Sequence, residues 1–202
     1  MIRAIIIDLD GTTLPRNWHS ISEANREALE KAGKQGITRI LATGRSVFSL
    51  NNTLPEGLPV DYMVFSSGAG IMRWHNREIL VTRELSPEET RDIATSLWKY
   101  DINFTIQQRI PNNHHFYYRN VSSLHEDFRR RIENYPGLGT PIQDTDEIQG
   151  GATQFLVILD ALQLQLHGDI QQKLSAYSVI RSTSPIDNQA IWTEIFAPNV
   201  NK

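Results

Sequence analysis

The chain has 202 residues, no cysteine and a formal net charge of −3, which fits one large domain or a core with a modest second domain. Without a basic excess to neutralise phosphates, the composition argues against nucleic acid and anionic membranes as partners. The missing cysteines exclude disulfides and thiolate chemistry.

No apolar run approaches the roughly 20 residues that span a bilayer. The first apolar run stops at Asp8 and is too short for the hydrophobic region of a signal peptide. We therefore expect a soluble, cytoplasmic protein that has no membrane partner.

The first 80 residues alternate strand and helix. The continuous apolar run at 2–7 predicts a strand buried on both faces. Further along, the patterns predict a helix at 21–36 with Ser22 as N-cap, a strand at 37–44, a short helix at 47–54 and a strand at 61–72 that enters a glycine-rich turn. This alternation predicts an α/β fold with a parallel sheet.

The pattern changes after residue 82. A capping box at Ser86 and Glu89 predicts a helix that runs to about Tyr100. A second capping box, Ser123 and Glu126, predicts another helix, whose arginines 129–131 we expect on a solvated face. Strands are predicted at 103–108, 114–120, 153–160, 178–184 and 190–197, a helix at 161–177, and a loop at 135–153. We expect residues 83–196 to form an inserted α+β domain, and residues 1–82, with 197–202 returning, to form the core.

Polar residues follow the predicted strands of the core where ligands bind open α/β sheets, at the carboxyl ends. Asp8 and Asp10 lie two apart and would face the same way if the strand geometry persisted. Two such carboxylates suit Mg²⁺, or a split between nucleophile and proton donor. Thr43 and Arg45 offer donors to an anion such as phosphate. An ordinary Asp-Gly turn is the plain alternative for Asp8 and Asp10.

The segments DLDGTT (8–13), LATGR (41–45), SSGAGI (66–71) and EIFAPNVNK (194–202) resemble the haloacid dehalogenase (HAD) superfamily, and most closely its Cof-type sugar-phosphate phosphatases. The resemblance runs from end to end. It implies a Rossmann-like core with an inserted C2-type α/β cap.

By this resemblance, Asp8 is the nucleophile that forms an aspartyl-phosphate, and Asp10 is the general acid and then the base. Mg²⁺ is held by the Asp8 carboxylate and the Asp10 backbone carbonyl. Thr43 and the Gly44 amide hold the phosphoryl oxygens, and Lys202 neutralises charge near the nucleophile. With Arg45, the anion donor noted above, Thr43 and Gly44 make up the predicted phosphate site.

The chain departs from the family pattern in two places. Ser67-Gly68 stands where the family usually has Asn-Gly, so a hydroxyl replaces an amide in this candidate substrate contact. Family members also continue past the lysine into a strand that ends in an acidic Gly-Asp motif, whereas the chain ends at Lys202. We therefore expect a C-terminally truncated phosphatase whose parallel sheet is incomplete, with an exposed edge through which it forms a homodimer.

The leading hypothesis is a Mg²⁺-dependent phosphohydrolase acting on a small phosphorylated metabolite, such as a sugar phosphate. Two alternatives stay open. The first is a catalytically impaired HAD protein with a binding or regulatory role. The second is a phosphotransferase or mutase that passes the phosphoryl group from Asp8 to a second sugar.

Overall fold

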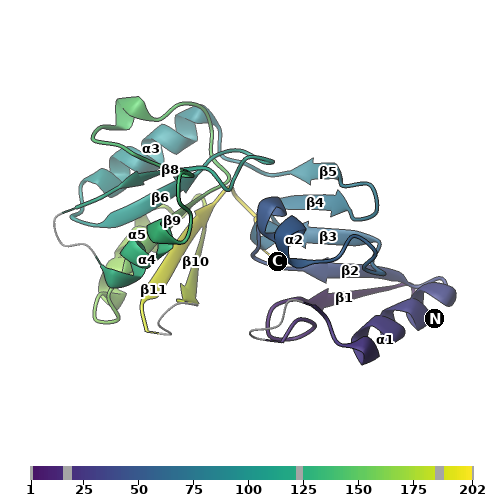
Figure 1. Cartoon of the computed structure of the whole chain (residues 1–202). Coiled ribbons are helices and arrows are strands. Elements are labelled where there is room, and N and C mark those ends of the chain that lie inside the picture. Colours follow the sequence, from purple (N-terminus) through teal and green to yellow (C-terminus); the bar gives the residue numbers. More distant parts are fainter. Residues whose placement is uncertain (1, 16–19, 122–124, 185–188, 202) are drawn as a thin grey trace. The chain divides into compact units, whose positions relative to one another are not determined.

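The computed structural model describes residues 2–15, 20–121, 125–184 and 189–201 (Figure 1). The chain divides into two compact units, which we describe separately. Unit 1 is Met1–Arg83 with Val200–Lys202, and unit 2 is Glu84–Asn199.

Unit 1 is built on a five-stranded sheet in the order β1-β2-β3-β4-β5 (Figure 1). Its elements are β1 (Ala4–Asp8), α1 (Glu23–Lys34), β2 (Thr38–Ala42), α2 (Val47–Thr53), β3 (Tyr62–Phe65), the 3₁₀ turn η1 (Ser66–Gly68), β4 (Gly70–Arg73) and β5 (Glu78–Thr82). The first three strands pair in parallel, and β4 and β5 continue the sheet antiparallel.

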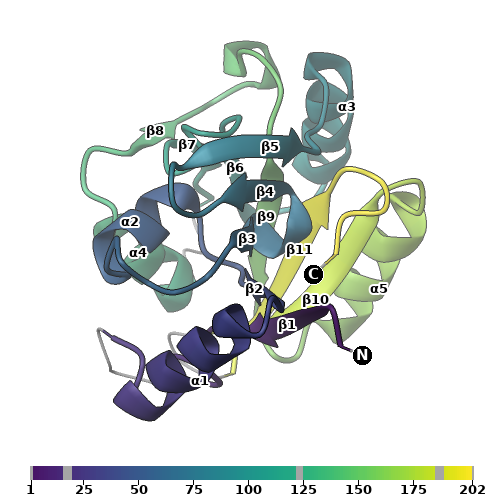
Figure 2. The ribbon, with the colours of Figure 1, turned by 90° about the vertical axis from the view of Figure 1, so that its right-hand side faces the viewer.

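Helices α1 and α2 connect the three parallel strands. Both crossovers step in the same direction along the sheet, so right-handed connections place both helices on one face (Figure 2). Ser22 caps α1 as predicted, since its hydroxyl accepts from the amide of Asn25, and Ser46 caps α2 in the same way. The carboxyl end of β2 is followed by a short loop before α2, whereas a longer connection follows β1.

The prediction of one strand at 61–72 is wrong. The chain reverses at Ser66–Gly68, and β3 and β4 are antiparallel neighbours. The sheet of unit 1 is therefore mixed rather than parallel throughout, and β5, which we did not predict, extends it.

Strand β1 lies at an edge of the sheet and pairs only with β2 in the described chain. The expected burial of both faces is wrong, because Ile6 is 70% exposed and Ile2, just before the strand, is 68% exposed. A continuous β-branched run fits a central strand, but here it lies on an edge. The expectation of an exposed edge beside β1 is confirmed.

A bidentate ion pair joins β2 to the start of β3. The Arg39 guanidinium donates to both carboxylate oxygens of Asp61 at 2.9 and 2.7 Å, and its Nη1 donates to the carbonyl of Leu29 in α1 at 3.4 Å. The hydrogen bond from Arg39 lowers the pKa of Asp61. Gly33 leaves room for this guanidinium, since a Cβ there would collide with it.

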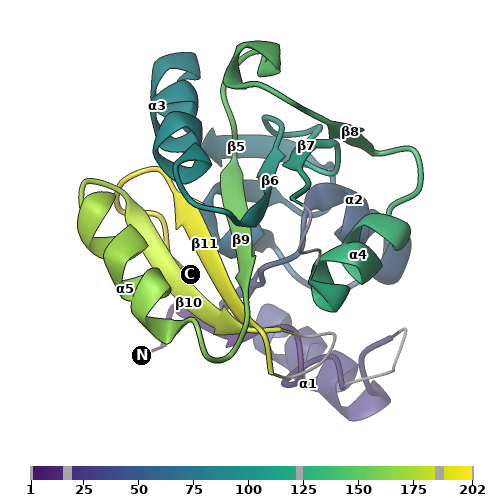
Figure 3. The ribbon, with the colours of Figure 1, turned by 90° about the vertical axis from the view of Figure 1, so that its left-hand side faces the viewer.

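Unit 2 contains a six-stranded sheet in the order β10-β11-β9-β6-β7-β8 (Figure 3). Its elements are α3 (Pro87–Trp98), β6 (Asn103–Gln107), β7 (Phe116–Arg119), α4 (Glu126–Glu133), β8 (Gly139–Pro141), η2 (Thr145–Glu147), β9 (Gln154–Leu159), α5 (Leu164–Lys173), β10 (Ser178–Thr183) and β11 (Ile191–Phe196). All neighbours are antiparallel except β7 and β8. The capping box at Ser86 and Glu89 that starts α3 is confirmed.

The helices of unit 2 cover both faces of its sheet. The Phe104 ring contacts Trp98 of α3 edge-on, and His167 of α5 lies 2.8 Å from the Thr193 hydroxyl. On the other face, Phe128 of α4 packs against a cluster that includes Leu156. Successive residues of a strand face opposite ways, which explains why the central strands are buried almost throughout.

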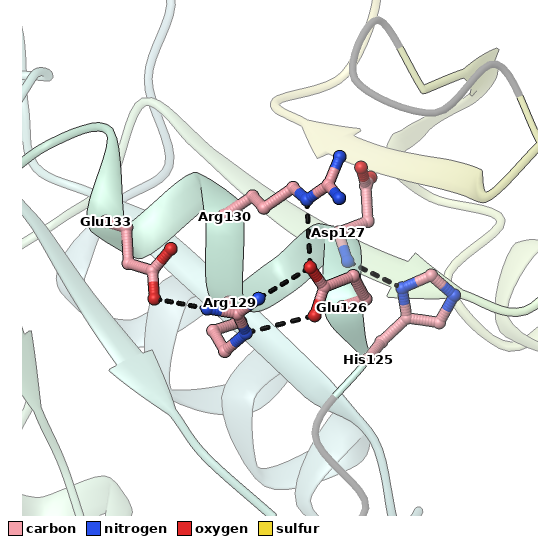
Figure 4. A network of polar contacts seen from close by, with 6 residues as sticks. All are labelled: His125, Glu126, Asp127, Arg129, Arg130 and Glu133. Carbon is pink, nitrogen blue, oxygen red and sulfur yellow. Dashed lines mark hydrogen bonds and ion pairs between the residues drawn. The ribbon is translucent and has the colours of Figure 1, made fainter.

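Helix α4 combines exposed ion pairs, which Figure 4 shows, with one enclosed arginine whose side chain is not drawn in that view. Arg129 bridges Glu126 and Glu133 at 2.6 Å each, and Arg130 reaches Glu126 at 2.9 Å, as expected for a solvated face. Arg131 differs from that expectation. Its guanidinium lies over the rings of Tyr135 and Trp192, and desolvation lowers its pKa.

Other predictions for unit 2 differ in detail. The region 135–153 is not all loop, because it contains β8 and η2, and α5 is shorter than 161–177. The predicted cap Ser123 lies outside the described residues. In the described chain the His125 imidazole accepts a hydrogen bond from the amide of Asp127 at the start of α4.

Over the same described residues, no helix combines the length and apolar character of a membrane span.

Candidate active site

The loop after β1 turns tightly and aims its polar groups at the strand end. Gly11 has φ +76°, a left-handed conformation that glycine adopts without strain, and its amide donates to the carbonyl of Leu14 at 2.8 Å. The Thr13 hydroxyl is buried and donates to the backbone carbonyl of Asp8 at 2.8 Å. The loop is therefore fixed by its own hydrogen bonds directly beside Asp8.

Asp8 is the last residue of β1 and is partly buried. The Thr12 hydroxyl donates to its Oδ2 at 3.4 Å, a long contact. The carboxylate therefore lies at the carboxyl end of a parallel strand, which is where open α/β sheets bind ligands.

Asp10 is held by two side chains from the next strand end. The Thr43 hydroxyl donates to its Oδ2 at 2.7 Å, and Arg45 Nε donates to its Oδ1 at 2.8 Å. Both carboxylate oxygens therefore have partners more than 30 residues away in the sequence, and the side chain of Asp10 is still 43% exposed.

Thr43-Gly44-Arg45 forms a compact turn at the end of β2. Thr43 is fully buried, and its hydroxyl also accepts the amide of Arg45 at 3.1 Å. The carbonyls of Thr43 and Arg45 accept the amides of Ser67 and Ser66 at 3.0 and 2.8 Å. These bonds join the second and third polar segments into one structure.

The third segment, Ser66–Gly68, has three consecutive positive φ angles of 49°, 54° and 95°. Its packing places Ser67 against Gly44, where a Cβ would lie 3.4 Å from the Ser67 hydroxyl oxygen. At Gly68 a Cβ would collide with the carbonyl of Asn201, so this glycine allows the C-terminal segment to approach. Lys202, which follows, lies outside the described residues.

The structure thus brings Asp10, Thr43 and Arg45 into direct contact and places Ser67 beside Gly44. Sequence reasoning missed Thr53, whose hydroxyl accepts from Arg45 Nη1 at 2.8 Å. It lies at the end of a short helix with no motif around it, and no sequence signal marks it.

The donor set suits Mg²⁺ in part. Asp8 offers a hard carboxylate oxygen, and Mg²⁺ is commonly bound through one or two carboxylates, with waters and substrate phosphates completing its shell. Among the described residues, no group of three or more His, Asp or Glu side chains gathers as a metal site. The Asp10 carboxylate is engaged by Thr43 and Arg45, which leaves its backbone carbonyl as the second candidate ligand.

Solved structures share this fold. BT1666 from Bacteroides thetaiotaomicron, described among phosphatases of the haloalkanoate (HAD) enzyme superfamily, superposes with a TM-score of 0.76 at 18% identity. The match covers 100% of this chain and 69% of BT1666. BT4131, described as a HAD subclass IIB sugar phosphatase, superposes with a TM-score of 0.66 at 15% identity, covering 98% of this chain and 71% of BT4131.

A curated relative is similar at the sequence level. The Bacillus subtilis (strain 168) protein YcsE, named 5-amino-6-(5-phospho-D-ribitylamino)uracil phosphatase, is 27% identical over 121 residues. That alignment covers 55% of this chain and 47% of YcsE, so the matched part is about half the length of that relative.

A model of the haloacid dehalogenase-like hydrolase family matches residues 5–202. This match includes all the polar segments described above and nearly the whole chain. The chain therefore belongs to the haloacid dehalogenase-like hydrolases.

Proposed function

We propose that this chain is a Mg²⁺-dependent phosphohydrolase that cleaves a small phosphorylated metabolite through an aspartyl-phosphate on Asp8. The observation that carries the proposal is that the Asp10 carboxylate accepts hydrogen bonds from Thr43 and Arg45. Asp10 lies two residues after Asp8, the last residue of β1. A strand end that supplies one carboxylate as a nucleophile and holds a second as an acid is suited to a two-step transfer.

In the first step, an Asp8 carboxylate oxygen attacks phosphorus and the bond to the leaving oxygen breaks. Asp10, protonated at that stage, gives its proton to the leaving alcohol. In the second step, Asp10 takes a proton from water while the water oxygen attacks phosphorus. Asp8 is released as a carboxylate together with inorganic phosphate, and every proton is accounted for.

The remaining polar groups stabilise charge. In this proposal the Gly44 amide and the Thr43 hydroxyl hold phosphoryl oxygens, and Ser67 beside Gly44 extends this set. Since Thr43 donates to Asp10 in the structure, its hydroxyl would serve the phosphoryl group only after that bond is exchanged. Lys202 would add a positive charge, as the family resemblance implies.

Mg²⁺, held by the Asp8 carboxylate and the Asp10 backbone carbonyl, would neutralise phosphoryl charge that otherwise repels the attacking carboxylate. This role requires that the chain bind Mg²⁺, which a direct binding measurement can detect. Titration calorimetry should show Mg²⁺ binding that Asp8→Asn weakens.

A sugar or polyol phosphate is the proposed substrate class. The support is the printed function of similar proteins: BT4131 is described as a sugar phosphatase, and YcsE is named for a phosphorylated ribityl compound. Both substrates carry a phosphate ester on a polyhydroxylated carbon chain.

The direct test is hydrolysis of p-nitrophenyl phosphate with and without Mg²⁺. The wild-type chain should hydrolyse it only with the ion, and Asp8→Asn should lose about 10²-fold or more in kcat because it removes the nucleophile. Asp101→Asn, at an exposed position of unit 2, serves as the matched control and should keep wild-type activity. Absence of hydrolysis together with tight phosphate binding would favour the binding or regulatory alternative.

A further inference from the structure

Arg45 lies between the candidate acid and a helix that otherwise has no part in the site. Its Nε donates to Asp10 Oδ1 at 2.8 Å, and its Nη1 donates to Thr53 Oγ1 at 2.8 Å. The guanidinium is therefore fixed at two points, and its side chain is 29% exposed.

Thr53 is suited to anchor this arginine. Its hydroxyl donates to the carbonyl of Ser49, one turn earlier in α2, at 2.8 Å. The proton of the hydroxyl is thus used within the helix, and a lone pair faces Arg45 Nη1. Because Thr53 is the last residue of α2, the helix itself fixes the position of the acceptor.

The Asp10 carboxylate is held from two sides as a result. Thr43 donates to Oδ2 at 2.7 Å while Arg45 donates to Oδ1 at 2.8 Å. Thr43 is fully buried and can shift little. Two donors on different oxygens fix the orientation of the carboxylate plane before substrate binds. When the Thr43 hydroxyl turns to the phosphoryl group, as proposed above, the anchored Arg45 is the donor that stays on Asp10.

We propose that Arg45 is a positioning residue that orients the Asp10 carboxylate for proton transfer, and that Thr53 of α2 is the anchor that orients Arg45. This inference rests on the proposed acid–base role of Asp10. A general acid must lie within hydrogen-bond reach of the leaving oxygen, and small misplacements lower the rate steeply.

This role differs from the phosphate contact that the sequence analysis predicts for Arg45 from the donors of its guanidinium. A phosphate ligand holds substrate and product, so its loss weakens phosphate binding and raises KM. Loss of a residue that positions the acid leaves phosphate binding intact, and it slows the step in which the leaving group takes its proton. The slowing is larger for a basic leaving group than for one that departs as a stable anion.

The experiment compares p-nitrophenyl phosphate with phenyl phosphate, whose leaving group is the more basic. Rapid mixing measures release of the phenol in the first turnover, before the phosphoenzyme hydrolyses. Arg45→Met should slow the first turnover of phenyl phosphate by roughly 10²-fold, and that of p-nitrophenyl phosphate by far less. Thr53→Val should show the same preference in weaker form, and Arg45→Lys should recover only part of the rate because lysine lacks the planar fork.

Binding of inorganic phosphate in the presence of Mg²⁺, measured by calorimetry, is the second readout. We expect the Kd to change less than about threefold in Arg45→Met and Thr53→Val. Arg73→Met and Thr38→Val are the matched controls and should leave all these quantities unchanged, because both residues lie at the ends of β4 and β2 opposite to the site.

Two outcomes would overturn the inference: equal slowing of both esters, or a loss of phosphate affinity in Arg45→Met that matches the loss of rate. If the wild-type chain releases no phenol from either ester, the proposed function fails instead. The contacts can then still be tested by nuclear magnetic resonance. The Arg45 Nε–H signal should exchange slowly with solvent in wild type, and fast in both Asp10→Ala and Thr53→Val. Slow exchange in both variants would refute the linkage.

Discussion

At the scale of single residues, the turn after β3 is the least ordinary part of the backbone. Ser66 and Ser67 adopt φ angles of 49° and 54°, which non-glycine residues rarely do, and Gly68 follows at 95°. Such conformations persist where the surroundings fix them. Here the amides of the two serines donate to the carbonyls of Arg45 and Thr43, so the strained turn aligns the second and third polar segments.

Gly68→Ala should therefore destabilise unit 1 by about 1–3 kcal/mol. The added Cβ would meet the Asn201 carbonyl, and the φ of 95° is unfavourable for alanine. Urea denaturation measures this free energy of unfolding. Gly57→Ala is the control, since the space around Gly57 is open, and equal stability of the two variants would contradict the explanation.

The sequence identified Asp8, Asp10, Thr43 and Arg45 as candidates because short motifs follow predicted strands. It did not reveal that Arg45 and Thr43 contact Asp10. Those contacts depend on the side-chain rotamers and on the parallel pairing of β1 with β2. Thr53 could not be found at all, because a threonine at a helix end is an ordinary residue.

At the scale of elements, Arg39 joins three of them: β2, which carries it, the carbonyl of Leu29 in α1, and Asp61 before β3. The pKa of Asp61 lies below its usual value because of the hydrogen bond from Arg39. A lowered pKa in the folded state means that the pair contributes stability above about pH 4, the ordinary range of an aspartate. That contribution is lost as the pH falls through the folded-state pKa.

Asp61→Asn should cost about 1 kcal/mol at pH 7, the scale of an ion pair near the surface. The difference between variant and wild type should narrow as the pH falls below about 4. Chemical denaturation at a series of pH values measures both. Glu27→Gln, which removes an exposed pair with Lys31 on α1, is the control, and a difference that widens in acid would contradict the assignment.

Helices were predicted more accurately than strands because their caps are local. Ser22 and the Ser86–Glu89 box mark the starts of α1 and α3 in the sequence and in the structure. The prediction of one strand at 61–72 was wrong because Ser66 and Ser67 adopt positive φ angles and reverse the chain. Two serines before a glycine do not indicate positive φ angles in a sequence. The prediction that β1 is buried on both faces was wrong for a different reason, because the composition of a strand does not reveal how many neighbouring strands it has.

At the scale of the whole molecule, the alternation of strands and helices predicted an α/β unit followed by an α+β unit. In the structure, the chain leaves unit 1 after Arg83 and returns to it at Val200. The order of helices and strands in unit 2 could be predicted except for β8 and η2. The order of strands in its sheet could not be predicted, because β9 pairs between β11 and β6, which are far apart in the sequence.

The exposed edge at β1 leads to a prediction about association. Edge strands with exposed apolar side chains pair readily with other chains, and Ile2 and Ile6 are 68% and 70% exposed. We expect the chain to form dimers as its concentration rises, and Ile6→Lys to shift it toward the monomer. Sedimentation velocity measures this shift, with Leu162→Lys, at a 93% exposed position in unit 2, as the control. A wild-type chain that stays monomeric at high concentration would contradict the prediction.

The central claim is that Asp8 carries the phosphoryl group. The most direct measurement is to quench the protein during turnover of p-nitrophenyl phosphate, reduce it with borohydride and map its peptides by mass spectrometry. An acyl phosphate is reduced to the alcohol, so the aspartate that carried it becomes homoserine. The account predicts this conversion at position 8 alone, dependent on Mg²⁺ and on substrate. Turnover with no conversion, or conversion of a different aspartate, would contradict it.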